Sequence, residues 1–151
     1  MGNQPYFAIS GLKPAQPIQG WRNFFDDGCG YLDTAVAAYE KRKKSFTAPI
    51  LYNLVAMAIE KFVMAVLMRH GAMPYNHTMA DLVEALDETF PGELSTMHDK
   101  LLQLDKYQEI CDLEGFSISP PAMEEIPAML VLAGQMQGLV TKKIYASQVE
   151  Q

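Results

Sequence analysis

The stretch from Ala48 to Met68, read as a helix, is apolar around almost its whole circumference. A helix without a polar face has to be surrounded by protein, so we expect this one to be the central helix of a bundle. Its polar interruptions are Asn53, Glu60 and Lys61. Asn53 and Glu60 are two turns apart and therefore lie along one line of the helix. If they are buried, these groups need hydrogen-bond partners, because a buried polar group without one is destabilising.

Composition places the chain among ordinary globular proteins. It has 151 residues, 49% of them hydrophobic, which predicts one domain with its own core. The net charge of −6 argues against a broad nucleic-acid interface, which requires a surplus of Lys and Arg. Glu60 and Lys61 would each cost about 2.5–3.5 kcal/mol in a bilayer core, and the start of the chain lacks a secretory signal. We therefore expect a cytoplasmic protein with no membrane span.

The pattern of hydrophobic residues predicts the organisation of the chain. Residues 1–20 are rich in Pro and Gly and are expected to form an extended N-terminal arm. Residues 21–148 are expected to form a single helical domain with five helical patterns and no strand pair. The patterns begin near Trp21, Thr47, Thr78, Leu94 and Ile126. The predicted fold class is all-α: an antiparallel four-to-five-helix up-and-down bundle preceded by the arm.

Two interpretations of the polar groups in the central helix remain open. Asn53 and Glu60 either line a polar pocket in the bundle, with Lys61 directed toward another neighbour, or form an internal hydrogen-bond network that fixes helix register. The two cysteines, Cys29 and Cys111, are far apart and are read as small buried hydrophobes. No cofactor or nucleotide motif of the glycine-rich kind occurs, so no cofactor is predicted.

The segment from Arg69 to Thr78 carries most of the reactive polar side chains. His77 precedes a predicted helix N-terminus, whose free N–H groups favour anions, and Arg69 and His70 end the preceding helix. A phosphate held here is one interpretation, and ordinary capping with a solvated turn is the other. His77 and Asp81 lack a third ligand, so no metal site is predicted.

Two further features have a structural and a functional interpretation. The run from Lys41 to Lys44 either meets RNA or an acidic partner, or is a solvated helix end. Gly28 and Gly30 fall inside a helical pattern, where each costs about 1 kcal/mol relative to Ala. Close helix packing is the favoured explanation for them.

A set of short motifs points to a known family. The central helix contains Ala58-Ile59-Glu60-Lys61 and closes at Gly71, an apolar ladder runs from His77 to Leu86, and Leu104-Asp105-Lys106-Tyr107 precedes a loop and a long last helix. In this order, residues 21 to 146 resemble a HEPN domain, a small helical bundle named for nucleotide binding. The resemblance implies a homodimer that acts as a metal-independent ribonuclease or as a non-catalytic partner of nucleotidyltransferases.

The ribonuclease branch of that family is marked by an Arg, a polar residue and, after four to six residues, a His. Here seven residues separate Arg69 from His77, and the stretch from Gln108 to Glu114 is acidic where many relatives carry an Arg-Tyr-Pro loop. We therefore expect a non-catalytic module that binds a nucleotide-like or other small anionic ligand, or a partner protein such as a nucleotidyltransferase. The candidate binding residues are Asn53, Glu60, Lys61, Arg69, His70, His77, Lys106 and Tyr107.

Two other classes of function stay open. In a ribonuclease of the toxin–antitoxin or defence type, Arg69 and His77 from two subunits would form a composite catalytic site, with His77 as acid or base. In an interaction protein, the dimer surface or the N-terminal arm would be the whole function.

Overall fold

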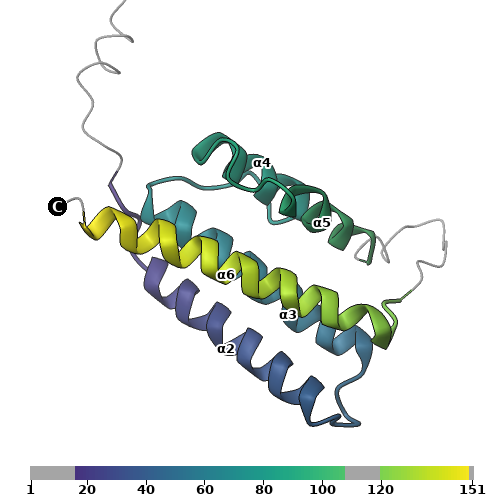
Figure 1. Ribbon diagram of the computed structural model, residues 1–151. Coiled ribbons are helices and arrows are strands. Elements are labelled where there is room, and N and C mark those ends of the chain that lie inside the picture. Colours follow the sequence, from purple (N-terminus) through teal and green to yellow (C-terminus); the bar gives the residue numbers. More distant parts are fainter. Residues whose placement is uncertain (1–15, 108–119, 150–151) are drawn as a thin grey trace, which may run out of the picture.

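The computed structural model describes residues 16–107 and 120–149, and these form an all-α bundle (Figure 1). Among these residues there is no strand, and five helices pack against one another. The predicted fold class is confirmed. The helices are α2 (Trp21–Glu40), α3 (Ala48–Arg69), α4 (Met79–Thr89), α5 (Met97–Gln103) and α6 (Ile126–Val149), with 3₁₀ turns η1 (Leu104–Tyr107) and η3 (Met123–Glu125).

The long helices α2, α3 and α6 lie side by side, and the shorter α4 and α5 lie together along one side of them (Figure 1). α2 and α3 are antiparallel, as predicted. α6 runs in the same direction as α3, since Ala48 and Met123 near their N-terminal ends line one cavity and Val66 and Val140 line another.

The central helix is enclosed over only part of its length. Every residue from Phe62 to Met68 is at most 5% exposed. Further toward the N-terminus, Ile50 and Met57 are 42% and 38% exposed, and Asn53 between them is exposed. The expected enclosure on every side is thus wrong for this first half of α3, because its neighbours α2, α4 and α6 leave one strip of the helix uncovered. α3 has the length and mean hydropathy (1.8) of a membrane span. However, 67% of the 18-residue stretch with this hydropathy is buried inside the bundle.

Several helix ends form as the sequence predicts. Thr47 caps α3 and Thr78 caps α4, each accepting a hydrogen bond from a backbone N–H three residues later. Gly28 is required by close packing, because a Cβ there would lie 2.8 Å from the Phe62 ring. The fourth predicted helix is shorter than expected: α5 begins at Met97, and η1 replaces the α-helix from Leu104.

The Leu104 carbonyl accepts a hydrogen bond from the Tyr52 hydroxyl at 2.8 Å, at the point where α5 gives way to η1. Leu104 and Tyr107, three residues apart, are both buried, as the tighter 3₁₀ period allows. Cys29 is partly rather than fully buried, with its sulfur 3.2 Å from Gln137 Nε2. Cys111 and most of the predicted arm lie outside the described residues.

Candidate functional site

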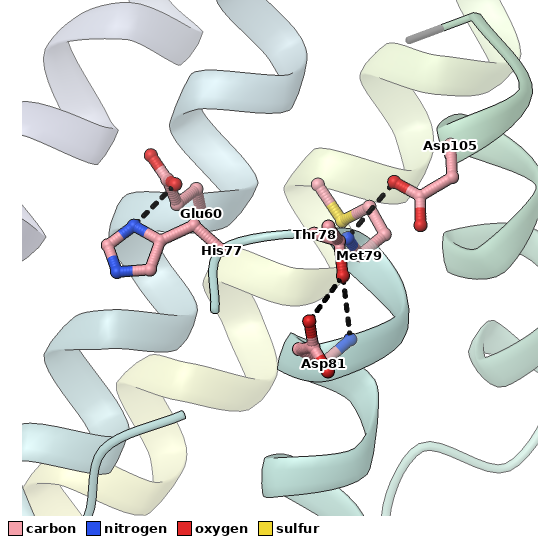
Figure 2. Close-up of polar contacts among 6 residues, drawn as sticks. All are labelled: Glu60, His77, Thr78, Met79, Asp81 and Asp105. Carbon is pink, nitrogen blue, oxygen red and sulfur yellow. Dashed lines mark hydrogen bonds and ion pairs between the residues drawn. The ribbon is translucent and has the colours of Figure 1, made fainter. Parts of the chain in front are cut away.

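Glu60 on α3 faces His77 on the connection between α3 and α4 (Figure 2). His77 Nδ1 lies 2.9 Å from Glu60 Oε2, and the two side chains are 53% and 27% exposed. An ion pair this open to water contributes about 0–1 kcal/mol. The structure therefore brings these two predicted site residues together, but at the surface instead of in a buried pocket.

The N-terminus of α4 is already occupied by groups of the same chain (Figure 2). The N–H of Met79 donates to Asp105 Oδ1 at 3.0 Å, and the N–H of Ala80 donates to Asp105 Oδ2 at 3.1 Å. Thr78 Oγ1 accepts from the N–H of Asp81 at 3.1 Å. A carboxylate thus sits where the sequence analysis placed a phosphate, so the predicted anion site is not open in this structure.

Arg69 and His70 are also engaged elsewhere. The Arg69 guanidinium lies 5.8 Å from the centroid of the Trp21 ring on α2. His70 Nδ1 is 3.0 Å from the Val66 carbonyl oxygen, and its ring packs edge-on against Phe90 at 4.9 Å between centroids.

Arg69 and the His77 pair do not converge within one chain. Arg69 follows Glu60, the partner of His77, by nine residues, or two and a half helical turns. The side chains of Glu60 and Arg69 therefore leave opposite faces of α3, about 13 Å apart along its axis. A composite Arg69–His77 site is not formed by the described part of a single subunit.

The interpretation of Asn53 and Glu60 as buried polar groups is wrong, because α3 leaves this line of the helix at the surface. Asn53 is exposed, Glu60 is half-buried, and among the described residues no polar or charged side chain is buried. Lys61 turns to the next helix, where its Nζ lies 4.5 Å from the centroid of the Phe24 ring. These residues form neither a closed pocket nor an internal network.

Tyr107 meets a carboxylate that sequence reasoning missed. Its hydroxyl donates to Glu125 at the end of η3, just before α6, and its ring packs at 5.1 Å against Tyr52. Burial, followed by the hydrogen bond to Glu125, raises the pKa of Tyr107 to about 12. The same hydrogen bond lowers the pKa of Glu125 below its ordinary value. Lys106 lies over the Tyr107 ring at 4.9 Å. The hydrogen bond between Tyr107 and Glu125 connects η1 to the segment just before α6.

A larger open cavity lies at the turn between α2 and α3, at the end of the bundle where α6 begins. Its volume is about 820 Å³. Two half-buried aromatic rings, Tyr39 and Phe46, line it together with apolar side chains of α2, α3 and Met123. Three exposed cations and one carboxylate also line it: Arg42, Lys43, Lys44 and Glu40. The cavity therefore combines apolar walls with an excess of positive charge.

The cations of this turn are not neutralised by neighbours: none of Arg42, Lys43 and Lys44 forms an ion pair with the described residues. Lys43 Nζ lies 6.0 Å from the centroid of the Phe46 ring. The sequence left a functional and a structural interpretation of the run from Lys41 to Lys44. The cavity beside these residues supports a binding function. The signal in the sequence was the placement of Tyr39 and Phe46 on either side of the basic run.

The backbone of the same turn is strained. Arg42 has φ 51°, in the left-handed region that favours glycine. The N–H of Lys43 donates to the Ala38 carbonyl at 3.1 Å, and that of Arg42 donates to the Tyr39 carbonyl at 3.1 Å. This pair of bonds is the Schellman motif, whose left-handed position is most often glycine. An arginine is held here at the cost of a less favourable backbone.

Within the described residues, no group of three His, Cys, Asp or Glu side chains is placed to hold a metal ion. Comparison of the chain with the models of known protein families, with curated proteins and with solved structures finds no match.

Proposed function

We propose that this protein is a non-catalytic helical binding module of HEPN-like kind, and that it binds a small anionic ligand of nucleotide type in the cavity at the α2–α3 turn. The observation that supports this is that one cavity is lined by two aromatic rings and by three cations that form no ion pair with the described residues. The position of the site differs from the one expected between Arg69 and His77, and the class of ligand is unchanged.

The chemistry of the cavity matches the two parts of such a ligand. Lys43, Lys44 and Arg42 supply N–H donors and positive charge for a phosphate, with Arg42 able to bind two oxygens at once. Tyr39 and Phe46 offer flat faces on which a base can stack, which contributes about 1–3 kcal/mol per base in known complexes. The volume of about 820 Å³ lies within the range of small-molecule sites.

Strain at Arg42 is a second line of support. A residue kept in an unfavourable backbone conformation is typical of functional sites, where the side chain is needed despite its cost. Glycine would satisfy the backbone of this turn but would remove one of the three cations.

No contact in the described chain favours the ribonuclease alternative. Arg69 lies against Trp21, and His77 is paired with Glu60 on the opposite face of α3. A catalytic site built from Arg69 and His77 would have to form between subunits. A protein partner such as a nucleotidyltransferase, and a cytoplasmic location, stay predictions.

The test is a calorimetric titration of the full chain with adenosine monophosphate, adenosine and inorganic phosphate. We expect the nucleotide to bind more tightly than either of its parts, because it uses both the rings and the cations. The double variant Lys43→Glu/Lys44→Glu should weaken nucleotide binding at least tenfold, or about 1.4 kcal/mol.

The control is Lys41→Glu, which makes half the charge change of the double variant in the same turn, at a residue that does not line the cavity. It should change the affinity by less than about threefold, the part due to long-range charge. The proposal is wrong if none of the three compounds binds, or if Lys41→Glu weakens binding as much as the double variant does.

A further inference from the structure

A carboxylate lines the cavity at the α2–α3 turn together with the three cations. Glu40 is the last residue of α2, and its side chain is exposed. It forms no ion pair with the described residues, although Arg42, Lys43 and Lys44 line the same cavity. The cavity therefore offers a hydrogen-bond acceptor that no cation of the described chain neutralises.

The position of Glu40 is unfavourable both for the helix and for a simple anion. The last turn of an α-helix carries the negative end of the helix dipole, where a cation is stabilising and a carboxylate is not. A carboxylate also repels a phosphate bound in the same cavity. A ligand with negative charge alone therefore leaves Glu40 unexplained, whereas a ligand that also carries hydrogen-bond donors would use it.

The common bases differ in the donors that they offer to a carboxylate. An ionised carboxylate only accepts hydrogen bonds, and its two oxygens can bind two neighbouring N–H groups at once. The Watson–Crick edge of guanine offers such a pair, the N1–H and the 2-amino group. Adenine and cytosine offer one amino group beside a ring nitrogen that is itself an acceptor, and uracil offers one N–H between two carbonyl oxygens. A carboxylate therefore favours guanine.

The groups that would bind the rest of such a ligand line the same cavity as Glu40. Tyr39, the preceding residue on α2, and Phe46 supply the aromatic rings on which a base can stack. The cations begin at Arg42, two residues after Glu40. A base that lies against these rings would have an acceptor for its edge and cations for its phosphate.

We propose that the ligand of this cavity is a guanine nucleotide, and that Glu40 selects it by accepting hydrogen bonds from the N1–H and the 2-amino group of the base. This inference rests on the function proposed above and adds the identity of the base. Because Glu40 is exposed, water can replace it as a partner for other bases, so the discrimination is smaller than in a closed pocket.

The experiment is a calorimetric titration of the full chain with guanosine, inosine and adenosine monophosphate, and the readout is the ratio of their affinities. The guanosine nucleotide should bind about tenfold more tightly than the adenosine nucleotide. The inosine nucleotide, which keeps the N1–H but lacks the 2-amino group, should lie between them. Glu40→Gln replaces one acceptor oxygen by a donor, so it should reduce the preference for guanosine over adenosine monophosphate to less than about threefold.

Asp33→Asn is the matched control, because it also removes one negative charge from α2 at an exposed residue that does not line the cavity. The loss of a charge acts on all three nucleotides alike and cancels in the ratio. Only Glu40→Gln should therefore change the ratio. Thermal unfolding of each variant checks that the fold is kept.

The selection of guanine and the binding of a nucleotide fail in different ways. If none of the three nucleotides binds, both proposals are wrong. If the three bind with equal affinity, or if Glu40→Gln keeps the ratio of the parent protein, the cavity still binds a nucleotide, but the selection of guanine by Glu40 is overturned.

Discussion

Two regions of this molecule were candidates for binding an anion, and they differ in what already occupies them. At the N-terminus of α4, the N–H groups of Met79 and Ala80 donate to the carboxylate of Asp105 (Figure 2). At the α2–α3 turn, Lys43 and Lys44 line an open cavity and form no ion pair with the described residues. A binding motif in the sequence is available to a ligand only when the fold does not supply a group of its own to fill it.

The largest expected effect comes from removing the carboxylate of Asp105, which occupies the N-terminus of α4. Asp105→Ala removes two charge-assisted hydrogen bonds from the start of α4 and should lower the free energy of unfolding by about 2 kcal/mol. Urea unfolding measures this loss. Asp105→Asn, which keeps one acceptor oxygen, should lose about half as much.

Asp105→Ala also tests the comparison between the two regions, because the freed N–H groups of Met79 and Ala80 should then bind an external anion. Phosphate should stabilise Asp105→Ala more than it stabilises the parent protein. Equal stabilisation of the two proteins would show that Asp105 does not occupy an anion site.

The second effect concerns the strained turn. Arg42→Gly relieves the left-handed backbone and should raise the free energy of unfolding by up to about 1 kcal/mol, while weakening nucleotide binding. Ser95→Gly is the matched control, since Ser95 has φ 48° and lies outside the cavity. It should stabilise the protein similarly and leave binding unchanged. If Arg42→Gly binds as tightly as the parent, Arg42 has no part in the site.

A third effect appears only at alkaline pH. The pKa of Tyr107 is raised to about 12 in the folded protein, so above pH 10 the unfolded chain releases this proton first. Stability should therefore fall as the pH rises from 10 to about 12. Chemical unfolding across this range measures the fall, and Tyr107→Phe should reduce it. Tyr75→Phe, at a side chain that is 97% exposed, should leave the profile as it is.

The smallest effect is expected at the Glu60–His77 pair. Glu60→Gln should change the free energy of unfolding by less than about 0.5 kcal/mol, because both side chains are open to water. It should also leave nucleotide binding unchanged. Thermal unfolding and the same calorimetric titration check both points. A large loss of stability would instead support the internal hydrogen-bond network that was one interpretation of the sequence.

The fold was predictable because its determinants are local. Caps such as Thr47 and Thr78 and the apolar period of each helix act within a few residues, and they formed as expected. The contents of the site were less predictable because they depend on distant partners. Asp105 reaches a helix that begins 26 residues earlier, and Tyr107 meets Glu125 across a loop. No spacing rule in the sequence indicates either contact.

The extent to which the apolar helices are buried was also hard to predict from the sequence, because it depends on distant parts of the chain. α3 was expected to be covered on all sides, yet Asn53 and Met57 lie on an uncovered strip. The composition of a helix indicates that it needs neighbours, but the lengths and directions of the other helices decide how much of it they cover. α4 and α5 are short, and the first half of α3 keeps an open side.

The central claim is that the α2–α3 turn, and not the connection between α3 and α4, is where this protein binds an anionic ligand. The most direct test is to follow the backbone amide NMR signals of the full chain while adenosine monophosphate is added. The account predicts shifts concentrated between residues 38 and 51, the stretch that holds every residue lining the cavity except Met123. Shifts concentrated between residues 69 and 81, or none at all, would contradict it.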